Sequence, residues 1–151
     1  MEEPKHVKGG EFLIESISPQ KVFTPEDFTE EQRLIARAAT EFAVGEVQPH
    51  MEDIEAQKEG LLPSLLKKAG ELGFLSGDIS EEYGGQELDK VSVTLVTEKL
   101  TQGGGSFMAS YGVHAGVGSL PIILFGNRDQ KTRYLPKLAT GEMIAAYALT
   151  E

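Results

Sequence analysis

The residues best suited to chemistry in this sequence are its three histidines, since the chain has no cysteine. His6, His50 and His114 are scattered, and no two of them have the spacing of metal ligands on one helix. Without cysteine, the chain has no disulfide, thiolate metal site or cysteine nucleophile. It also lacks the G-x-S-x-G motif of serine hydrolases and the phosphate-binding P-loop. The residues alone therefore predict no metal site and no catalytic group.

His114 stands out because it is the one charge-capable residue in the apolar stretch 103–126, GGGSFMASYGVHAGVGSLPIILFG. A core histidine that is hydrogen-bonded to the backbone is the simplest interpretation, and a role in a site is the alternative. Tyr111 and Tyr147 are similarly interpreted as core residues whose hydroxyl groups find a partner.

The element that must position these side chains is a helix over the same stretch, capped by Ser106 and stopped by Gly126. A helix that is apolar on all sides belongs in a protein interior, and this one is too short and glycine-rich for a confident membrane span. Its internal glycines each cost roughly 1 kcal/mol relative to alanine. Either close helix packing offsets that cost, or the glycines form a wall that leaves room for an apolar ligand.

Four further helices are predicted around this one, and each begins at a cap or at a proline. They run from Thr29 to Pro49, from Pro63 to Gly73, from Asp89 to Leu100 and from Asn127 to Leu138. Leu34 and Leu72 are expected on inward faces of the first two helices, and Pro136 is expected to interrupt the last one. Residues 73–88, between the second and third helices, should form a loop.

The chain therefore reads as a mainly α protein in three parts. Residues 1–23 are predicted to form an extended arm, residues 24–141 a helical domain, and residues 142–151 a single strand. Because a lone strand leaves its backbone groups without partners, we expect a second, β-rich domain to follow.

The charge balance narrows the possible partners. The net charge is −10, from 24 acidic and 14 basic residues, and there is no basic patch. Nucleic acid and anionic membrane surfaces are thus not expected as partners. The N-terminus lacks the apolar segment of a secretory signal, so a soluble cytoplasmic protein is expected.

The run 126–151, GNRDQKTRYLPKLATGEMIAAYALTE, resembles the acyl-CoA dehydrogenase family, in which a helix leads into a strand that ends A-x-T-E. The matching positions are Gly126, Gln130, Lys131, Tyr134, Leu135, Pro136, Leu138, Gly141, Glu142, Ala148, Thr150 and Glu151. Upstream, Glu82-Tyr83-Gly84-Gly85 resembles the family's E-Y-G-G loop, although Ser80 stands where a proline is common. The phrase VHAGVGSLPIILFG and the long N-terminal arm look nearest to the very-long-chain branch.

The resemblance implies a helical N-terminal domain, a middle β-domain and a C-terminal four-helix domain, with FAD bound between the last two. It implies α,β-dehydrogenation of a fatty acyl-CoA, in which a carboxylate takes the α-proton and the flavin takes the β-hydride. The catalytic glutamate of the family lies in the C-terminal domain, so no catalytic residue is assigned in this chain. An electron-transferring flavoprotein and a homo-oligomer of the full-length protein are the implied partners, and no integral membrane segment is expected.

Two groups of site residues follow from the resemblance. Tyr147, Leu149 and Thr150 match positions that touch the flavin. Candidates for contact with the acyl chain, chosen by their helical spacing on the central helix, are Tyr111, Ala115, Gly116 and Ser119.

Two alternatives remain open at this point. An acyl-CoA oxidase would keep the fold and pass electrons to oxygen, and a free-standing helical module would bind acyl chains or a partner without chemistry. For the chain by itself we expect an exposed apolar patch, self-association and no turnover of acyl-CoA.

Overall fold

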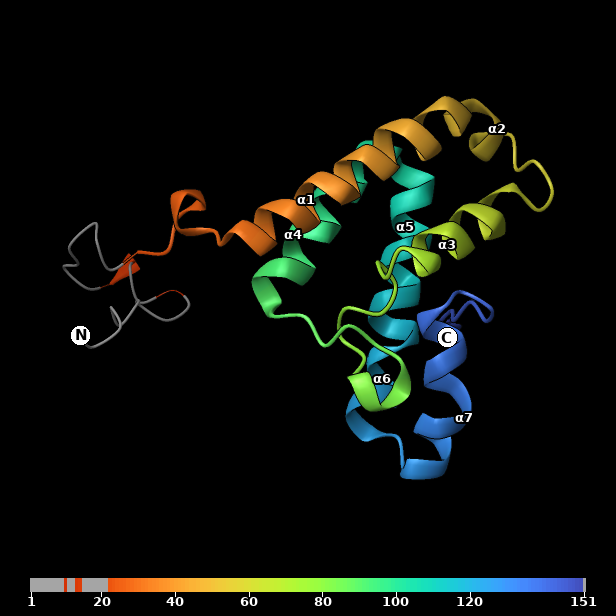
Figure 1. The fold of residues 1–151 in the computed structure, drawn as a ribbon. Helices are drawn as coiled ribbons and strands as arrows, with labels where there is room; N and C mark the ends of the chain where they lie inside the picture. The colour runs from red at the N-terminus through yellow and green to blue at the C-terminus, as the bar shows by residue number, and fades with distance from the viewer. Residues whose placement is uncertain (1–9, 11–12, 15–21, 151) are drawn as a thin grey trace.

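The computed structural model describes Gly10, residues 13–14 and residues 22–150, and the regular structure of these residues is helical (Figure 1). The mainly α class is thereby confirmed. Most of the predicted arm, residues 1–23, lies outside the described residues.

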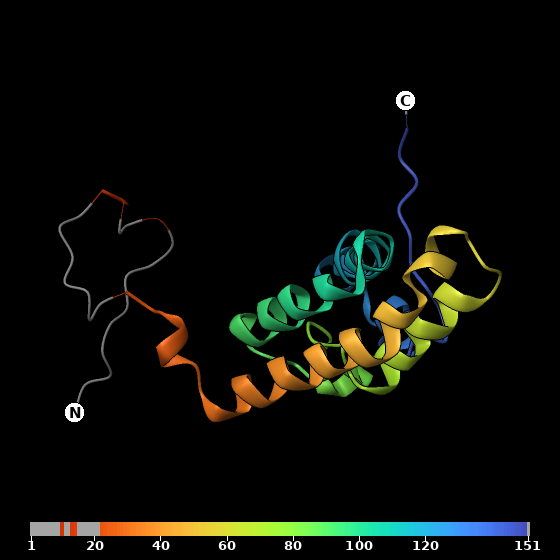
Figure 2. The same ribbon diagram turned by 90° about the horizontal axis from the view of Figure 1, so that it is seen from above.

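Two helices that are distant in sequence, α1 (Glu30–Phe42) and α4 (Lys90–Leu100), lie side by side in both views (Figures 1 and 2). Thr29 and Gln32 form the predicted capping box of α1, with the Thr29 amide 3.0 Å from Gln32 Oε1. Asp89 caps α4 as predicted, and its carboxylate also accepts a hydrogen bond from Gln32 Nε2 at 3.1 Å. The caps therefore satisfy free backbone amides and tie the starts of the two helices together.

Helix α1 ends earlier than its sequence pattern predicts. Its α-helical ladder stops at Phe42, and the chain continues through a π turn η4 (Ala43–Val47), a 3₁₀ turn η5 (Gln48–His50) and helix α2 (Met51–Glu55). Leu34 is 53 % exposed, so its assignment to the inward face is wrong. The residues of α1 that are buried are Gln32, Ala39 and Phe42.

Helix α3 (Leu61–Glu71) returns beside α2, and it begins before Pro63, at Gly60 with φ 74°. Leu65 and Leu66 are buried as expected, but Leu72 is 58 % exposed because it follows the end of the helix. The predicted loop 73–88 is confirmed and contains one 3₁₀ turn, η6 (Glu81–Tyr83).

Helix α7 (Arg128–Ala139) begins at the predicted cap Asn127, whose Oδ1 accepts the Gln130 amide at 2.9 Å. The predicted interruption at Pro136 is wrong, since the helix runs through it. Leu135 and Leu138 are both buried, and their packing on either side of the proline holds the helix together.

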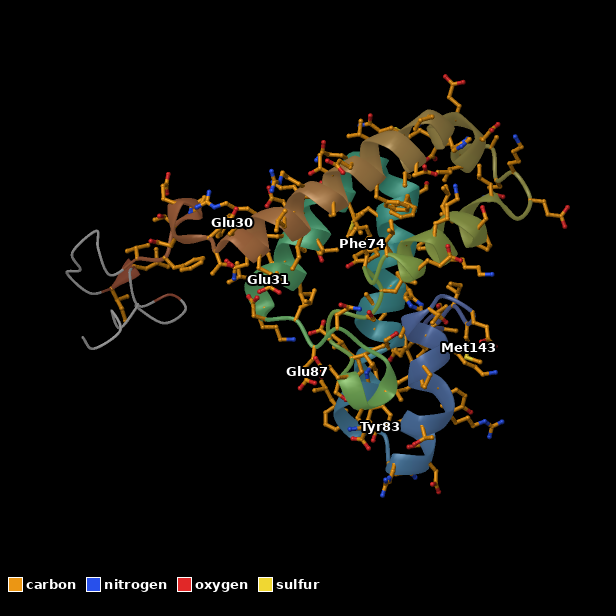
Figure 3. The ribbon with its side chains drawn as sticks, in the orientation of Figure 1. Glu30, Glu31, Phe74, Tyr83, Glu87 and Met143 are labelled. Atoms are coloured by element: carbon orange, nitrogen blue, oxygen red, sulfur yellow. The ribbon has the colours of Figure 1, made fainter. Side chains whose placement is uncertain are left out.

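The core has two parts. The larger part joins α1, α3, α4 and α5 (Gly105–Val113) around tilted aromatic rings, with the ring centroid of Phe42 5.7 Å from that of Phe74 and 6.1 Å from that of Phe107. Figure 3 shows Phe74 between α1 and α3. The smaller part lies at the other end of the molecule and consists of Ile79, Leu135, Leu138 and Ala139. One apolar helical stretch runs from the larger core to the smaller, and it positions the candidate site.

Candidate functional site

The central apolar stretch forms three helical pieces joined end to end. They are α5 (Gly105–Val113), a π turn η8 (His114–Gly118) and α6 (Leu120–Phe125). Ser106 lies inside α5, so its assignment as the cap is wrong: the cap is Gly104, whose φ of 90° favours glycine. Gly126 ends the stretch as predicted.

A kink interrupts this stretch at Gly116, whose φ of −84° and ψ of −106° are not helical. Next to the kink, the Ser119 hydroxyl donates to the carbonyl oxygen of His114 at 2.6 Å, which satisfies a group freed from the helical ladder. The expectation that this stretch is too short for a membrane span is wrong, since Gly105–Phe125 is long and apolar enough by length and composition. The core helices of soluble proteins pass the same test, although they are mostly buried and only 22 % of an 18-residue window in this stretch is buried. A π turn within an α-helix frequently marks a functional site.

His114 is fully buried beside this kink. Its Nε2 lies 3.1 Å from the Leu138 carbonyl oxygen on α7, and its Nδ1 lies 3.0 Å from the amide nitrogen of Ala145. The interpretation as a core histidine bonded to the backbone is confirmed. Burial lowers the pKa of His114, and the hydrogen bond to Leu138 opposes this only in part.

The residues after α7, here called the terminal segment (142–150), form no helix or strand within the described chain. The Met143 amide donates to the Lys137 carbonyl at 3.0 Å, and a Cβ added to Gly118 would lie 2.6 Å from Ala145 Cβ. Figure 3 places Met143 beside α7. A strand needs a ladder partner, so pairing of this segment with a β-domain stays a prediction.

Three of the four residues chosen for acyl contact line one small inner pocket. Tyr111, Ala115 and Ser119 face a cavity of about 20 Å³, which has room for about one water molecule. The Tyr111 hydroxyl donates to the Phe74 carbonyl at 3.2 Å, and burial raises the pKa of Tyr111. In this conformation the inner pocket is too small for an acyl chain.

The fourth residue, Gly116, lies on an open apolar groove of about 410 Å³. This kink groove includes Gly116, Val117, Leu120, Leu124, Phe125 and Tyr147. Tyr147 is 59 % exposed, so its interpretation as a core residue is wrong. The groove thus brings together one predicted acyl-contact residue and one predicted flavin-contact residue.

Leu149 and Thr150, the other two predicted flavin-contact residues, are exposed beyond the groove. The described hydrogen bonds of the terminal segment stop at Ala145, so residues 146–150 have free backbone groups. Figure 2 shows this end of the chain projecting from the helices.

Sequence reasoning missed most of the groove's wall. Leu120 and Leu124 are four residues apart on α6, which places both on one face of that helix, and the kink brings Gly116 to the same groove. This spacing was a usable signal, but a helix that is apolar on every side gives no reason to prefer one face.

Comparison with known proteins defines the class. The family described as "Acyl-CoA dehydrogenase, N-terminal domain" matches residues 29–142. A probable acyl-CoA dehydrogenase of Bacillus subtilis is 54 % identical over 144 residues, covering 95 % of this chain and 24 % of that protein. The mitochondrial isovaleryl-CoA dehydrogenase of Pongo abelii is 33 % identical over 124 residues, covering 82 % of this chain and 29 % of that protein.

A solved structure agrees with these relatives. The crystal structure of an acyl-CoA dehydrogenase from Bacillus anthracis, complexed with FAD, superposes with a TM-score of 0.89 at 54 % identity. The match covers 96 % of this chain and 25 % of the other. The fold is therefore an acyl-CoA dehydrogenase N-terminal helical domain. The chain belongs to the acyl-CoA dehydrogenase family and spans between about a quarter and a third of the length of the relatives it matches. Nearness to the very-long-chain branch stays a prediction.

Proposed function

We propose that this chain serves as the N-terminal helical domain of an FAD-dependent enzyme that converts a fatty acyl-CoA to its trans-2-enoyl-CoA. The observation that carries the proposal is the kink groove, where apolar side chains from the central helix meet Tyr147. The chain spans about a quarter of the length of the Bacillus subtilis relative. Turnover therefore belongs to the whole protein, and the chain by itself should be inactive.

The terminal segment fits a flavin chemically. Tyr147 offers an exposed aromatic ring, Leu149 an apolar side chain and Thr150 a hydroxyl group, and the backbone around them is free to bond. We assign these three residues to FAD contact. When bound, FAD supplies the acceptor for the hydride that leaves the substrate.

In the reaction, this chain binds the acyl chain of the substrate and excludes water from it. The kink groove offers an apolar surface for the acyl chain, and covering it would remove water from the reacting end. Tyr111, Ala115 and Ser119 would touch an acyl chain only after the inner pocket widens. We place the catalytic base outside this chain, because none of its acidic residues matches the family motif of the base.

Acyl-chain preference tests the groove. We expect Val117→Phe in the whole protein to lower kcat/KM for long acyl-CoA substrates about tenfold, because a larger side chain fills the groove, and to spare short ones. Leu34→Phe is the matched control, since Leu34 is exposed to a similar degree on the distant helix α1. An equal loss for all chain lengths would contradict the placement of the acyl chain.

The electron acceptor decides between the remaining enzyme classes. A dehydrogenase passes electrons to an electron-transferring flavoprotein, whereas an oxidase consumes oxygen. We expect turnover of the whole protein with the flavoprotein and little oxygen uptake; the reverse result would make it an oxidase. If the whole protein neither binds FAD nor forms enoyl-CoA, the chain is a non-enzymatic acyl- or partner-binding module. The cytoplasmic location and the homo-oligomer also stay predictions.

A further inference from the structure

The two ring nitrogens of His114 face opposite kinds of backbone group. Nδ1 lies 3.0 Å from the Ala145 amide, which can only donate, so Nδ1 must accept. Nε2 lies 3.1 Å from the Leu138 carbonyl oxygen, which can only accept, so Nε2 must carry the proton. These partners select the neutral imidazole with its proton on Nε2.

A second proton would break this arrangement. Protonated histidine has N–H groups at both nitrogens, so Nδ1–H would point at the Ala145 N–H and the hydrogen bond would be lost. The influences on the pKa of His114 are burial and the Leu138 carbonyl, with no charged group among them.

The titratable groups nearest to His114 along its own helix and at the junction of α7 with the terminal segment already have partners of their own. On its own helix, the Tyr111 hydroxyl bonds Phe74, and between α7 and the terminal segment Lys137 Nζ pairs with Glu142 Oε1 at 3.1 Å. A charged His114 would therefore gain no compensating carboxylate from these side chains.

Ala145 is seated closely on the kinked helix. Gly118 provides the space, because a Cβ there would lie 2.6 Å from Ala145 Cβ and 3.1 Å from its carbonyl carbon. The bond to His114 is also the last described hydrogen bond before Tyr147, Leu149 and Thr150. His114 and Gly118 thus determine where the free end of the terminal segment begins.

We propose that His114 is a positioning residue that fixes the flavin-contacting end of the terminal segment through Ala145, and that it holds the segment only while its ring is neutral. The claim that this end of the segment contacts the flavin rests on the proposed function. The claim that His114 fixes the segment through Ala145 does not rest on it.

The direction of the pH effect follows from burial. Because burial lowers the pKa of His114 in the docked state, the released state binds the proton more readily. The contribution of His114 to docking is fully present above the ordinary histidine pKa of about 6.5 and weakens as pH falls towards the lower, docked value. Across that window the docking equilibrium falls by up to tenfold per pH unit.

Nuclear magnetic resonance of the 151-residue chain tests the holding directly. In the unsubstituted chain, we expect the ring nitrogens of His114 to show the Nε2–H tautomer at pH 7, with a pKa below the ordinary histidine value. The hydrogen-exchange protection factor of the Ala145 amide should fall as His114 titrates. The inference would be overturned by an Nδ1–H tautomer, or by an Ala145 protection factor that does not change as His114 titrates. Both results come from the unsubstituted chain.

Three variants separate positioning from packing. His114→Leu should lower Ala145 protection at pH 7 at least tenfold. His114→Asn supplies a side-chain oxygen near the Nδ1 position, so it should keep the protection and make it independent of pH. His50→Asn is the matched control and should behave like the unsubstituted chain. Equal loss in the Leu and Asn variants would assign His114 to packing alone.

Flavin retention in the whole protein tests the second half. We expect His114→Leu to raise the Kd for FAD about tenfold at pH 7. His114→Asn should keep FAD binding near that of the unsubstituted protein and remove the part of the pH dependence of binding that His114 causes. If the resonance results hold but flavin retention does not change, the flavin contact is wrong and the positioning of the segment stands. If the resonance results fail, the positioning itself is wrong.

Discussion

At the scale of the residue, Gly85 shows how the E-Y-G-G loop folds. Its amide donates to the Ser80 carbonyl at 3.0 Å, which draws the backbone against the preceding turn. A Cβ at Gly85 would lie only 1.8 Å from the Ile79 carbonyl oxygen. Gly84 takes a φ of 80°, a conformation that favours glycine. Both glycines of the motif are therefore needed for the shape of the loop.

We expect Gly85→Ala to lower the free energy of unfolding by about 1–3 kcal/mol, because the new methyl group forces the backbone apart. Gly45→Ala is the control, since no atom lies within 4 Å of a Cβ there, and alanine should be neutral or stabilise by up to about 1 kcal/mol. Urea unfolding followed by circular dichroism measures both. Similar midpoints for the two variants would contradict the close approach.

At the scale of the element, Asp89 connects two helices. It accepts hydrogen bonds from the Val91 and Ser92 amides at 2.8 and 3.1 Å, and from Gln32 on α1. Partial burial by itself would raise the pKa of Asp89, but the hydrogen bonds from Ser92, Val91 and Gln32 outweigh it and hold the pKa below 3.8.

We expect Asp89→Ala to cost about 1 kcal/mol of stability at pH 7, a typical value for a lost cap. Because the folded-state pKa is lowered, the charge contributes fully above the ordinary pKa of 3.8, and its contribution disappears as pH falls through the folded value. The stability difference from the unsubstituted chain should thus shrink below pH 4.

Asp129→Ala is the matched control. Asp129 is an exposed acidic residue in the first turn of α7, and its side chain makes none of the described hydrogen bonds. Thermal unfolding at pH 7 and pH 3 measures both variants. An equal loss in the two variants would mean that the helix dipole alone explains the effect, and a loss for Asp89→Ala that is unchanged at pH 3 would mean that the carboxylate charge does not contribute.

At the scale of the whole molecule, helix α6 is covered on one face only: Ile122 and Ile123 pack against the smaller core, whereas Leu124 and Phe125 are exposed in the described chain. Phe125 is 86 % exposed and Leu124 is 64 % exposed. Tyr147 and Leu149 of the terminal segment are also exposed apolar side chains. A buried interior helix was predicted here. Helix α5, the first part of the central stretch, fits that prediction because Phe107 and Tyr111 are buried, but no residue of α6 is fully buried.

We expect the 151-residue chain to self-associate and to bind an apolar dye, because this exposed surface is costly in water. The double change Leu124→Glu, Phe125→Glu should reduce both effects strongly. Leu72→Glu is the control, since Leu72 is an exposed leucine just after the end of helix α3. Light scattering measures association, and a monomer without dye binding would contradict the prediction.

Signals that act within a few residues could be read from the sequence. The Thr29–Gln32 capping box, the Asp89 cap and the stop at Gly126 all formed as predicted, because each depends on neighbouring backbone groups. The motif from Gly126 to Glu151 also predicted the family, which the comparisons confirm.

Only the tertiary structure decided the rest. The partners of His114 lie 24 and 31 residues away, so no local pattern could identify them. Helix α7 passes Pro136 because buried leucines hold it, and Leu34 is exposed although the helical period allows it to face inward. The sequence determined which segments are helical and to which family they belong, whereas packing between distant segments decided which apolar faces are covered and where the groove opens.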